Sequence, residues 1–283
     1  MVFVKLDNGI LSVTIADHGA EIRSVKKGDC EYMWCADEKW WGRCAPVLFP
    51  IVGGLKDKKC IIDGKEYSMG QHGFARDMDF ELAEQTENSA TFVLKSNEET
   101  LEKYPYEFAL TIKYILDGQK LKVCWIVENK NDGEMLFSIG AHPAFNLRDG
   151  ENYFSFDKEG DLSYHLIDEA GLYVKEPVYI LKNDGYVPIL KDMFNRDALI
   201  VEDNQARRVS LCGSDKKPYV TMTFTAPLFG LWSKPDGAPF VCIEPWYGRC
   251  DANDADGNFA NKDHIQSLEA GGIFSAEYEI EFI

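Results

Sequence analysis

At 283 residues, with 45% hydrophobic and 13% aromatic residues, the chain has enough apolar material to bury a large core. Its formal net charge of −17 repels phosphate groups, which excludes nucleic acids and anionic membranes as expected partners and leaves small molecules. The first ten residues, MVFVKLDNGI, contain no signal-peptide pattern, and the sequence holds no run of about 18 apolar residues. We therefore expect a soluble, cytoplasmic protein.

The N-terminal residues predict a β-hairpin. Residues 2–4 and 10–15 are rich in apolar and β-branched side chains, and Asp7-Asn8-Gly9 between them is a turn signal. The best helix candidate is residues 97–104, in which Asn97 would cap the first turn and Pro105 would end the helix. Because this candidate is short, helix content should be low.

Strand patterns dominate the middle and the end of the chain. Apolar and polar side chains alternate over residues 107–114, a turn at Asp117-Gly118 follows, and residues 121–127 form the next strand-like run. Residues 220–232 predict a strand pair interrupted at Pro227, and the last ten residues alternate apolar with acidic side chains.

The eight cysteines are scattered, with neither a C-x-x-C pair nor the clustered spacing of a zinc site. Cys124 and Cys242 lie inside apolar strand-like runs, where a thiol behaves as a small hydrophobic group. Without a secretory signal we expect reduced thiols. No cysteine sits in a recognisable nucleophile setting, so a catalytic cysteine is not indicated.

An aromatic segment covers residues 34–57, WCADEKWWGRCAPVLFPIVGGLKD. Three tryptophans crowd Gly42 and Arg43, and Pro46 and Pro50 suit a loop or a sheet edge better than a central strand. Such aromatic area can stack on a sugar ring. It can equally form a second, loop-covered core, and the residues alone leave both interpretations open.

The segment that follows, residues 67–80, places Gln71, His72, Arg76 and Asp77 together between glycines. Polar groups on a loop beside a sheet are good candidates for function. The alternative for Arg76 is a surface ion pair with Asp77 or Asp79.

The stretch LFSIGAHPAFNL, residues 136–147, carries a histidine at the rim of a predicted sheet. An apolar run leads through Gly140 into His142, and Pro143 then stops the strand ladder. Histidine is the side chain best suited to proton transfer near neutral pH, which makes His142 a catalytic candidate. A packed or capping histidine is the alternative.

The stretch APFVCIEPWYGRCD, residues 238–251, mirrors it, because an apolar strand ends in Glu244 and Pro245 follows at once. A carboxylate is costly to bury unless it is paired or used, and burial would raise its pKa and make it a better base. The alternative is a strand-end glutamate that reaches solvent. Asp197, just before the apolar end of MFNRDALIV, is a candidate substrate ligand or a capping and turn residue.

No internal repeat, low-complexity tract or linker divides the chain. Many short strands with turn signals every eight to twelve residues are typical of an antiparallel sandwich. We predict an all-β protein with one domain over residues 1–283.

Four segments resemble the aldose 1-epimerase family, the galactose mutarotases: A-H-P-A-F-N-L around His142, C-I-E-P-W around Glu244, Q-H-G-F-A-R at residues 71–76 and A-P-V-L-F-P-I-V-G-G at residues 45–54. The last two are similar to the branch that includes the hexose-6-phosphate epimerases. The resemblance runs from about Asp7 to the C-terminus. It implies a single-domain antiparallel β-supersandwich with an open cleft, and interconversion of the α and β anomers of a free hexose without metal or cofactor.

The resemblance also implies roles for named residues. His142 matches the general acid that protonates the ring oxygen, and Glu244 matches the base that takes the proton of the anomeric hydroxyl. His72 and Asp197 match substrate-binding residues. Arg43 and Arg76 lie where the sugar-phosphate branch has basic residues, and the expected partner is a monosaccharide or a sugar phosphate, bound by a monomer or homodimer.

Three other functions stay open at this stage. The first is a hexose-6-phosphate 1-epimerase in which Arg43 and Arg76 clamp the phosphate, although the negative charge of the chain opposes an anionic substrate. The second is a carbohydrate-binding protein that has lost turnover. The third is a metal enzyme with His72, His142 and Glu244 as ligands, which no short metal-binding motif supports.

Overall fold

The computed structural model describes residues 1–283, and strands make up most of its regular structure. The largest sheet has nine strands, in the spatial order β18 (Val187–Pro188), β15 (Tyr153–Phe156), β20 (Arg208–Cys212), β21 (Pro218–Phe224), β25 (Ile273–Phe282), β11 (Lys120–Asn129), β10 (Phe108–Asp117), β9 (Ser89–Lys95) and β8 (Glu81–Gln85). β10, β11 and β25 pair in antiparallel register over nine or more residues, because their side chains alternate without a break.

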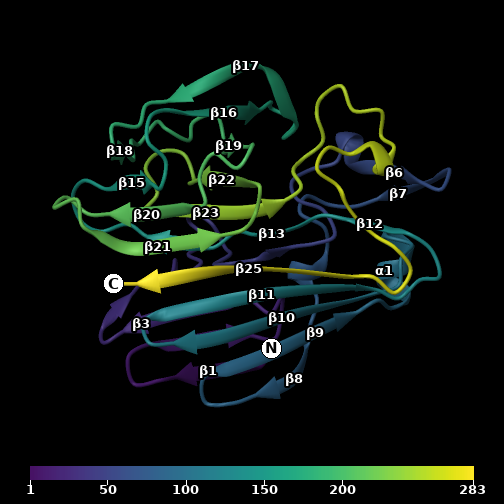
Figure 1. Ribbon diagram of the computed structural model, residues 1–283, viewed down its shortest axis with the longest axis horizontal. Helices are drawn as coiled ribbons and strands as arrows, with labels where there is room; N and C mark the ends of the chain where they lie inside the picture. Colours follow the sequence, from purple (N-terminus) through teal and green to yellow (C-terminus); the bar gives the residue numbers. More distant parts are fainter.

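A second sheet of eight strands carries the predicted catalytic residues. Its order is β17 (Tyr173–Leu181), β16 (Leu162–Ile167), β19 (Leu199–Val201), β22 (Leu228–Trp232), β23 (Phe240–Tyr247), β13 (Ile139–Ala141) and β5 (Val47–Leu48), and β14 (Ala144–Asn146) also pairs with β23. Figure 1 shows β23 and β22 above the layer of β25, β11, β10 and β9.

The smaller elements complete the fold. A four-stranded sheet contains β1 (Phe3–Asp7), β2 (Ser12–Ala16), β3 (Ile22–Lys27) and β4 (Cys30–Glu31), and two-stranded sheets pair β6 (Lys59–Ile62) with β7 (Lys65–Ser68) and β12 (Met135–Phe137) with β24 (Gln266–Leu268). Short 3₁₀ turns cover Lys56–Lys58, Ala75–Asp77 and Phe259–Asn261. None of the helices has the length and apolar character needed to cross a membrane.

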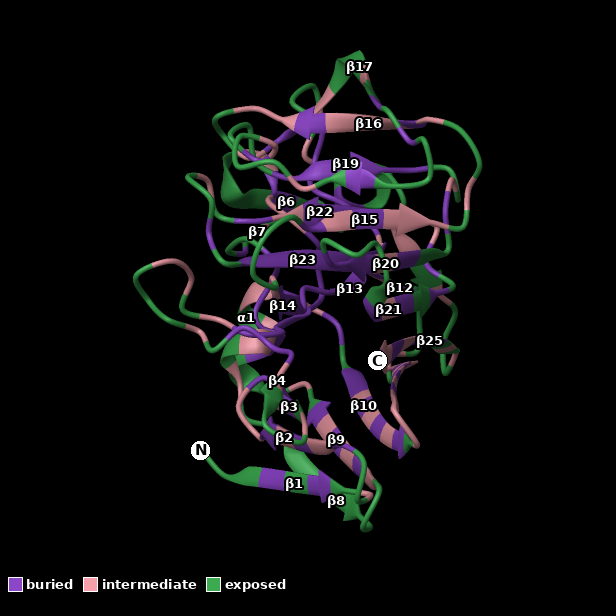
Figure 2. Cartoon of the chain, turned by 90° about the vertical axis from the view of Figure 1, so that its left-hand side faces the viewer, coloured by how far each residue is buried: buried purple, intermediate pink, exposed green.

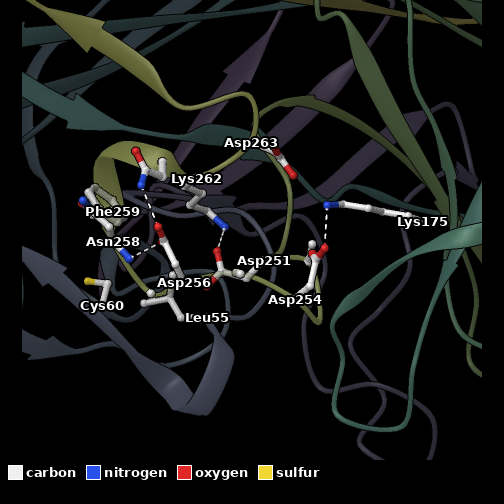
Figure 3. A pocket seen from close by; sticks show the side chains of 14 residues that line it. Leu55, Cys60, Lys175, Asp251, Asp254, Asp256, Asn258, Phe259, Lys262 and Asp263 are labelled. Carbon is white, nitrogen blue, oxygen red and sulfur yellow. Dashed lines mark hydrogen bonds and ion pairs between the residues drawn. The ribbon is translucent and has the colours of Figure 1, made fainter.

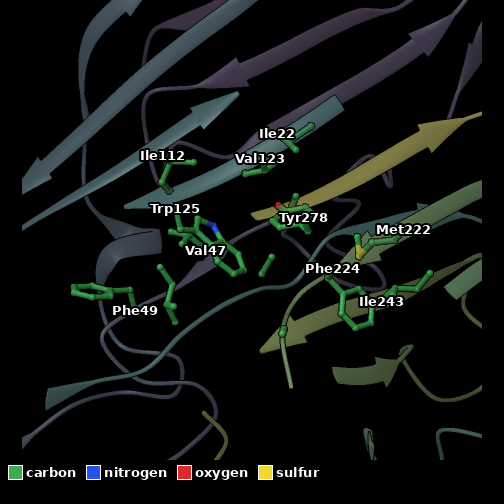
Figure 4. Packing of buried hydrophobic residues seen from close by; sticks show 14 of the residues in the cluster. Ile22, Val47, Phe49, Ile112, Val123, Trp125, Met222, Phe224, Ile243 and Tyr278 are labelled. Atoms are coloured by element: carbon green, nitrogen blue, oxygen red, sulfur yellow. The ribbon is translucent and has the colours of Figure 1, made fainter. Parts of the chain in front are cut away.

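The main core lies between the layers. Figure 4 shows Trp125 of β11 and Tyr278 of β25 packed near Phe224 of β21 and Ile243 of β23. Ile243 faces this core, so its neighbour Glu244 faces the other side of the second sheet, since side chains alternate along a strand. Figure 2 shows β23 buried along its length, whereas the edge strands β8 and β17 are largely exposed.

The structure confirms the all-β antiparallel fold and several local predictions. β1 and β2 form the predicted hairpin across residues 7–9. The only α-helix is α1 (Glu98–Lys103): the Asn97 side chain accepts a bond from the backbone N–H of Thr100, the Thr100 hydroxyl accepts one from the backbone N–H of Asn97, and Tyr104 ends the helix.

Two predictions were wrong. Residues 220–232 do form two strands, β21 and β22, but these lie in different sheets and do not pair, because the chain crosses between layers at Pro227. The strand containing Glu244 does not end there. Pro245 removes one ladder donor only: the register with β22 continues through Pro245 to Trp246, Trp246 and Tyr247 also pair with β13, and β23 continues to Tyr247.

Candidate active site

A row of residues across the second sheet brings Glu244 and His142 together. Glu244 lies opposite Gly230 of β22. On the other side of β23, the pairs Gly140–Trp246 and Ala144–Cys242 flank His142 and fix its place opposite Glu244. Side chains opposite each other on neighbouring strands project from the same face of a sheet. The two residues, 102 positions apart in sequence, therefore meet because of strand register.

The His142 and Glu244 side chains are in contact and buried. His142 Nε2 lies 3.2 Å from Glu244 Oε2, and the two side chains are 10% and 1% exposed. His142 Nδ1 and Glu244 Oε1 are also buried, and neither has a hydrogen-bond partner. Buried polar atoms without partners are rare in folded proteins and are typical of places where a ligand binds or a reaction occurs.

Burial shifts both pKa values toward the neutral side chains. Loss of solvation, reinforced by the nearby charge of Asp197, raises the pKa of Glu244 well above its ordinary value of 4.5. Loss of solvation lowers the pKa of His142 to about 3, and the positive charges of Arg76 and Arg43 act in the same direction. Burial therefore favours the neutral carboxyl group of Glu244 and the neutral imidazole of His142.

His72 stands beside this pair, with its ring edge-on to that of His142 at 5.6 Å between centroids. The backbone N–H of Gly53 donates to His72 Nδ1 at 3.0 Å, so the ring proton of the neutral imidazole is on Nε2. Gly53 has φ +71°, and a Cβ there would lie 2.5 Å from Cys250 Cβ, so only glycine fits. Burial lowers the pKa of His72 well below 6.5 and keeps the ring neutral.

Three tryptophans line the site around His142 and Glu244. The Trp41 ring stacks on His142 at 4.7 Å, and Trp232 meets His142 edge-on at 5.4 Å. Trp246 lies over two glycines, because a Cβ on Gly140 or Gly230 would come within 2.6 Å or 2.4 Å of its ring.

The other tryptophans of residues 34–57 belong to the second, loop-covered core that the sequence alone left open for this segment. Trp34 is buried in a small satellite core with Phe240, and Trp40 packs against it. The segment thus forms a second core and also supplies Trp41 to the cavity wall.

The pair opens into a cavity of ≈ 210 Å³. Aromatic and polar side chains from six segments line it: Trp41, Gln71, His72, Arg76, His142, Asp197, Trp232, Lys234, Glu244 and Trp246. A wider cleft continues outward past Gln71 and Asp197 to Arg196 and Asn195. A partly open cavity of this size, lined by aromatic and polar side chains, can hold one small polar ring.

Asp197 lines the cavity and also makes a turn. Its backbone has φ +69°, and its Oδ1 accepts a bond of 2.7 Å from the backbone N–H of Ala198. Burial raises the pKa of Asp197. The turn interpretation of Asp197 is confirmed, and the same residue lines the cavity.

The two arginines occupy different positions. Arg76 Nη2 donates to the carbonyl of Gln71 at 2.7 Å, and its buried Nε has no hydrogen-bond partner. Loss of solvation and the nearby Arg43 lower the pKa of Arg76 to about 10. Arg43 Nη2 donates to Asp77 at 2.8 Å and does not line the cavity. Asp77 lies 3.7 Å from Arg76 Nε, so the predicted ion pair exists as a long contact.

A second cavity is lined by several acidic residues and by two lysines, Lys175 and Lys262 (Figure 3). In it Lys262 Nζ donates to Asp251 at 2.7 Å, with both side chains buried, and Lys175 pairs with Asp254 at 2.9 Å. Asp251 also accepts the backbone N–H of Lys56 at 2.9 Å, and its own N–H donates to the carbonyl of Gly54. The Asp251 carboxylate is thus paired with Lys262, and Asp251 holds the loop at residues 53–56 through hydrogen bonds to Lys56 and Gly54.

The structure thus places five of the predicted site residues, His142, Glu244, His72, Arg76 and Asp197, around one cavity, whereas Arg43 does not line it. Sequence reasoning did not identify Trp232, Lys234 or Trp246 as cavity residues. Trp246 follows Glu244 by two positions, so alternation along β23 was the available signal. Trp232 and Lys234 come from the end of β22, and no local pattern marked them.

Comparisons with known proteins agree with this fold. The family model for aldose 1-epimerase matches residues 3–260. Protein LacX (plasmid) of Lactococcus lactis subsp. lactis is 32% identical over 261 residues, which cover 87% of each chain. A solved galactose mutarotase related enzyme from Lactobacillus acidophilus is 38% identical, with a TM-score of 0.94 over 100% of this chain and 97% of that one. A galactose mutarotase-like protein from Lactobacillus casei ATCC 334 is 27% identical, with a TM-score of 0.93 over 100% of both chains.

These matches extend over nearly the whole chain and agree with the strand order described above. The chain belongs to the aldose 1-epimerase family.

Proposed function

We propose that this protein is an aldose 1-epimerase that interconverts the α and β anomers of a hexose by general acid–base ring opening. The observation that carries the proposal is the contact of 3.2 Å between His142 and Glu244, each buried, each with an unpartnered atom and both lining one cavity. The anomeric hydroxyl and the ring oxygen of a pyranose are attached to the same carbon. Two groups this close together can therefore reach both oxygens at once.

The proton balance of the reaction fits the pair. Moving its proton from the carboxyl group to the imidazole gives a carboxylate and an imidazolium with no change in total protons. Glu244 then removes the proton of the anomeric hydroxyl while His142 protonates the ring oxygen, and the bond between C1 and the ring oxygen breaks. Rotation about C1–C2 exposes the other face of the carbonyl group, and ring closure returns both protons. Each proton carrier is worth about 10²- to 10⁴-fold in rate.

The remaining cavity residues bind the sugar in this proposal. His72 Nε2–H donates to a ring hydroxyl, because Gly53 already occupies Nδ1. Asp197 accepts from another hydroxyl, and the apolar faces of Trp41 and Trp232 contact the C–H face of the ring.

A second candidate is a hexose-6-phosphate 1-epimerase. The unpartnered Nε of Arg76 and the amine of Lys234 both belong to the cavity, and an arginine fork binds phosphate well. Arg43 holds Asp77 beside Arg76. The net charge of −17 disfavours encounter with an anion, which places the neutral hexose first.

The test is NMR exchange between the anomers of glucose, galactose and glucose 6-phosphate, measured with the wild type, Arg76→Gln and a matched control, Arg208→Gln, which changes an exposed arginine on β20. The proposal expects faster exchange of at least one free hexose. Faster exchange of the phosphate ester alone, lost in Arg76→Gln and kept in Arg208→Gln, would transfer the assignment to the second candidate. Sugar binding without faster exchange between the anomers of any of these sugars would indicate a binding protein and contradict both epimerase assignments.

A further inference from the structure

Cys242 lies beside the proposed acid and base but takes no part in the reaction above. A ring nitrogen of His142, Cys242 Sγ and a carboxylate oxygen of Glu244 all lie within 4.8 Å of one another. Cys242 and Glu244 are alternate residues of β23 and so share a face, and His142 reaches them from across the sheet. Exposure of the three residues is 8%, 0% and 1%.

We propose that these three side chains form an inhibitory site for Zn²⁺ or a similar thiophilic divalent cation. Imidazole nitrogen, thiolate sulfur and carboxylate oxygen are the ligands that zinc takes, at bonds of about 2.0–2.3 Å. Ligand atoms around such an ion are about 3–4 Å apart. The His142–Glu244 contact of 3.2 Å already has that spacing, and Cys242 Sγ, within 4.8 Å of both ligand atoms, has to approach them by about 1 Å.

Charge balance favours the ion in this buried place. Metal binding displaces the thiol proton of Cys242 and the carboxyl proton of Glu244 to solvent, and His142 binds through a neutral nitrogen. The divalent ion with one thiolate and one carboxylate then has no net charge, which reduces the cost of burying it. His142 Nδ1 and Glu244 Oε1, the remaining polar atoms of these two side chains, are buried without a hydrogen-bond partner.

Three protein ligands leave a fourth zinc position for water or a sugar hydroxyl, and two of the three, His142 and Glu244, line the cavity. The metal would inhibit, because it takes the lone pairs with which His142 and Glu244 move protons. His72 is not part of this ligand group, because its Nδ1 is bound to Gly53. A metal site of His72, His142 and Glu244 was considered from the sequence; the structure instead groups Cys242 with His142 and Glu244. Metal binding at these residues does not depend on the proposed function, whereas inhibition by the metal does.

The direct test is a titration of the reduced protein with Co²⁺, followed by the near-ultraviolet absorption that a cobalt–thiolate bond produces, and then with Zn²⁺ as competitor. The variants are Cys242→Ser, Cys242→Ala and, as a matched control, Cys212→Ser, which changes a buried cysteine on β20. The wild type and Cys212→Ser should show the band for one Co²⁺ per chain, removed by one equivalent of Zn²⁺. Both Cys242 variants should lose it.

Anomer exchange gives a second readout. Stoichiometric Zn²⁺ should slow exchange by the wild type at least tenfold, whereas Cys242→Ala, with its basal rate kept, should need at least tenfold more Zn²⁺. A wild type without the cobalt–thiolate band, or a band that persists in both Cys242 variants, would overturn the proposal. The absorption result stands even if no sugar is turned over, so failure of the zinc site and failure of the epimerase assignment are distinguishable.

Discussion

Glu244 and His142 are placed where water cannot stabilise their charged forms. Neither side chain has a fixed counter-charge at hydrogen-bond distance other than its partner, and each keeps one buried atom free. Elsewhere the chain treats a buried carboxylate differently: Glu202 is bound by Arg249 and His264, and these groups with Tyr173 lower its pKa to about 2. The Glu202 carboxylate is thus bound by charged partners, whereas Glu244 and His142 have only each other, and in the proposed reaction this leaves them able to exchange a proton.

The pH dependence of anomer exchange should reflect this pair. The active form carries one shared proton. Because the pKa of His142 is lowered to about 3, the second proton enters only near that pH, so activity should persist well below pH 6.5. On the alkaline side, activity falls when Glu244 loses the shared proton, above the ordinary glutamate range. The profile of kcat/KM against pH is the measurement, and an acid limb near pH 6.5 would contradict the assignment.

Glu244→Gln should stabilise the protein while removing activity. The folded-state pKa of Glu244 lies above its unfolded value of 4.5, so the unfolded state loses a proton first and wild-type stability falls as pH rises above 4.5. Gln lacks this cost. We expect a gain of about 1 kcal/mol or more at pH 7, growing between pH 5 and pH 7, since one pKa unit corresponds to about 1.4 kcal/mol. Urea unfolding at both pH values measures it, and a gain independent of pH would count against the raised pKa.

At the scale of elements, a loop held by an ion pair determines where His72 stands. Asp251, paired with Lys262, accepts a hydrogen bond from the backbone N–H of Lys56 in this loop. Gly53, in the same loop, donates its N–H to the His72 ring and accepts the backbone N–H of His72. A substitution at Asp251 therefore acts on the site without touching the sugar.

Asp251→Ala should destabilise the protein by about 3–5 kcal/mol, because Lys262 would be left as a buried, unpaired charge. The double variant Asp251→Ala with Lys262→Met removes both charges and should recover most of that loss. Denaturant unfolding of both variants and the wild type measures the difference. Equal losses in the single and the double variant would mean that the pair itself contributes little.

Local patterns predicted individual elements well. Asn97 and Pro105 bracketed α1 within one or two residues, and alternation over residues 107–114 identified β10, because these signals act within a few residues. The pattern misplaced the end of β23 at Pro245, where a proline replaces one ladder donor without ending the strand. It also paired β21 with β22, although a turn signal does not say which sheet the next strand joins.

In the site, too, the individual residues could be predicted from local patterns, whereas their contacts could not. His142 and Glu244 stood out because each is a polar residue in an apolar run, but their contact depends on the register of β13, β14 and β23, which no local pattern specifies. Cys242 was interpreted as a small hydrophobic residue, and its position next to the pair follows only from that register.

At the scale of the molecule, the main core extends from β1 to β25, so the first and last strands contribute to one set of packed side chains. The N-terminus leads into β1 of the four-stranded sheet, and the C-terminus follows β25 of the nine-stranded sheet (Figure 1). We propose on this basis that residues 1–283 fold as a single domain. The expected result is one unfolding transition, with tryptophan fluorescence and far-ultraviolet circular dichroism coinciding across urea concentrations. Two separated transitions would indicate two folding units.

The measurement that tests the central claim most directly is NMR exchange between sugar anomers, with the sugar that the wild type turns over fastest, using His142→Asn and Glu244→Gln beside the wild type. If these two residues are the acid and the base, each variant should remain folded and lose about 10²- to 10⁴-fold in exchange rate. A folded variant of either residue that exchanges anomers within a few-fold of the wild type would remove that residue from the chemistry and contradict the account.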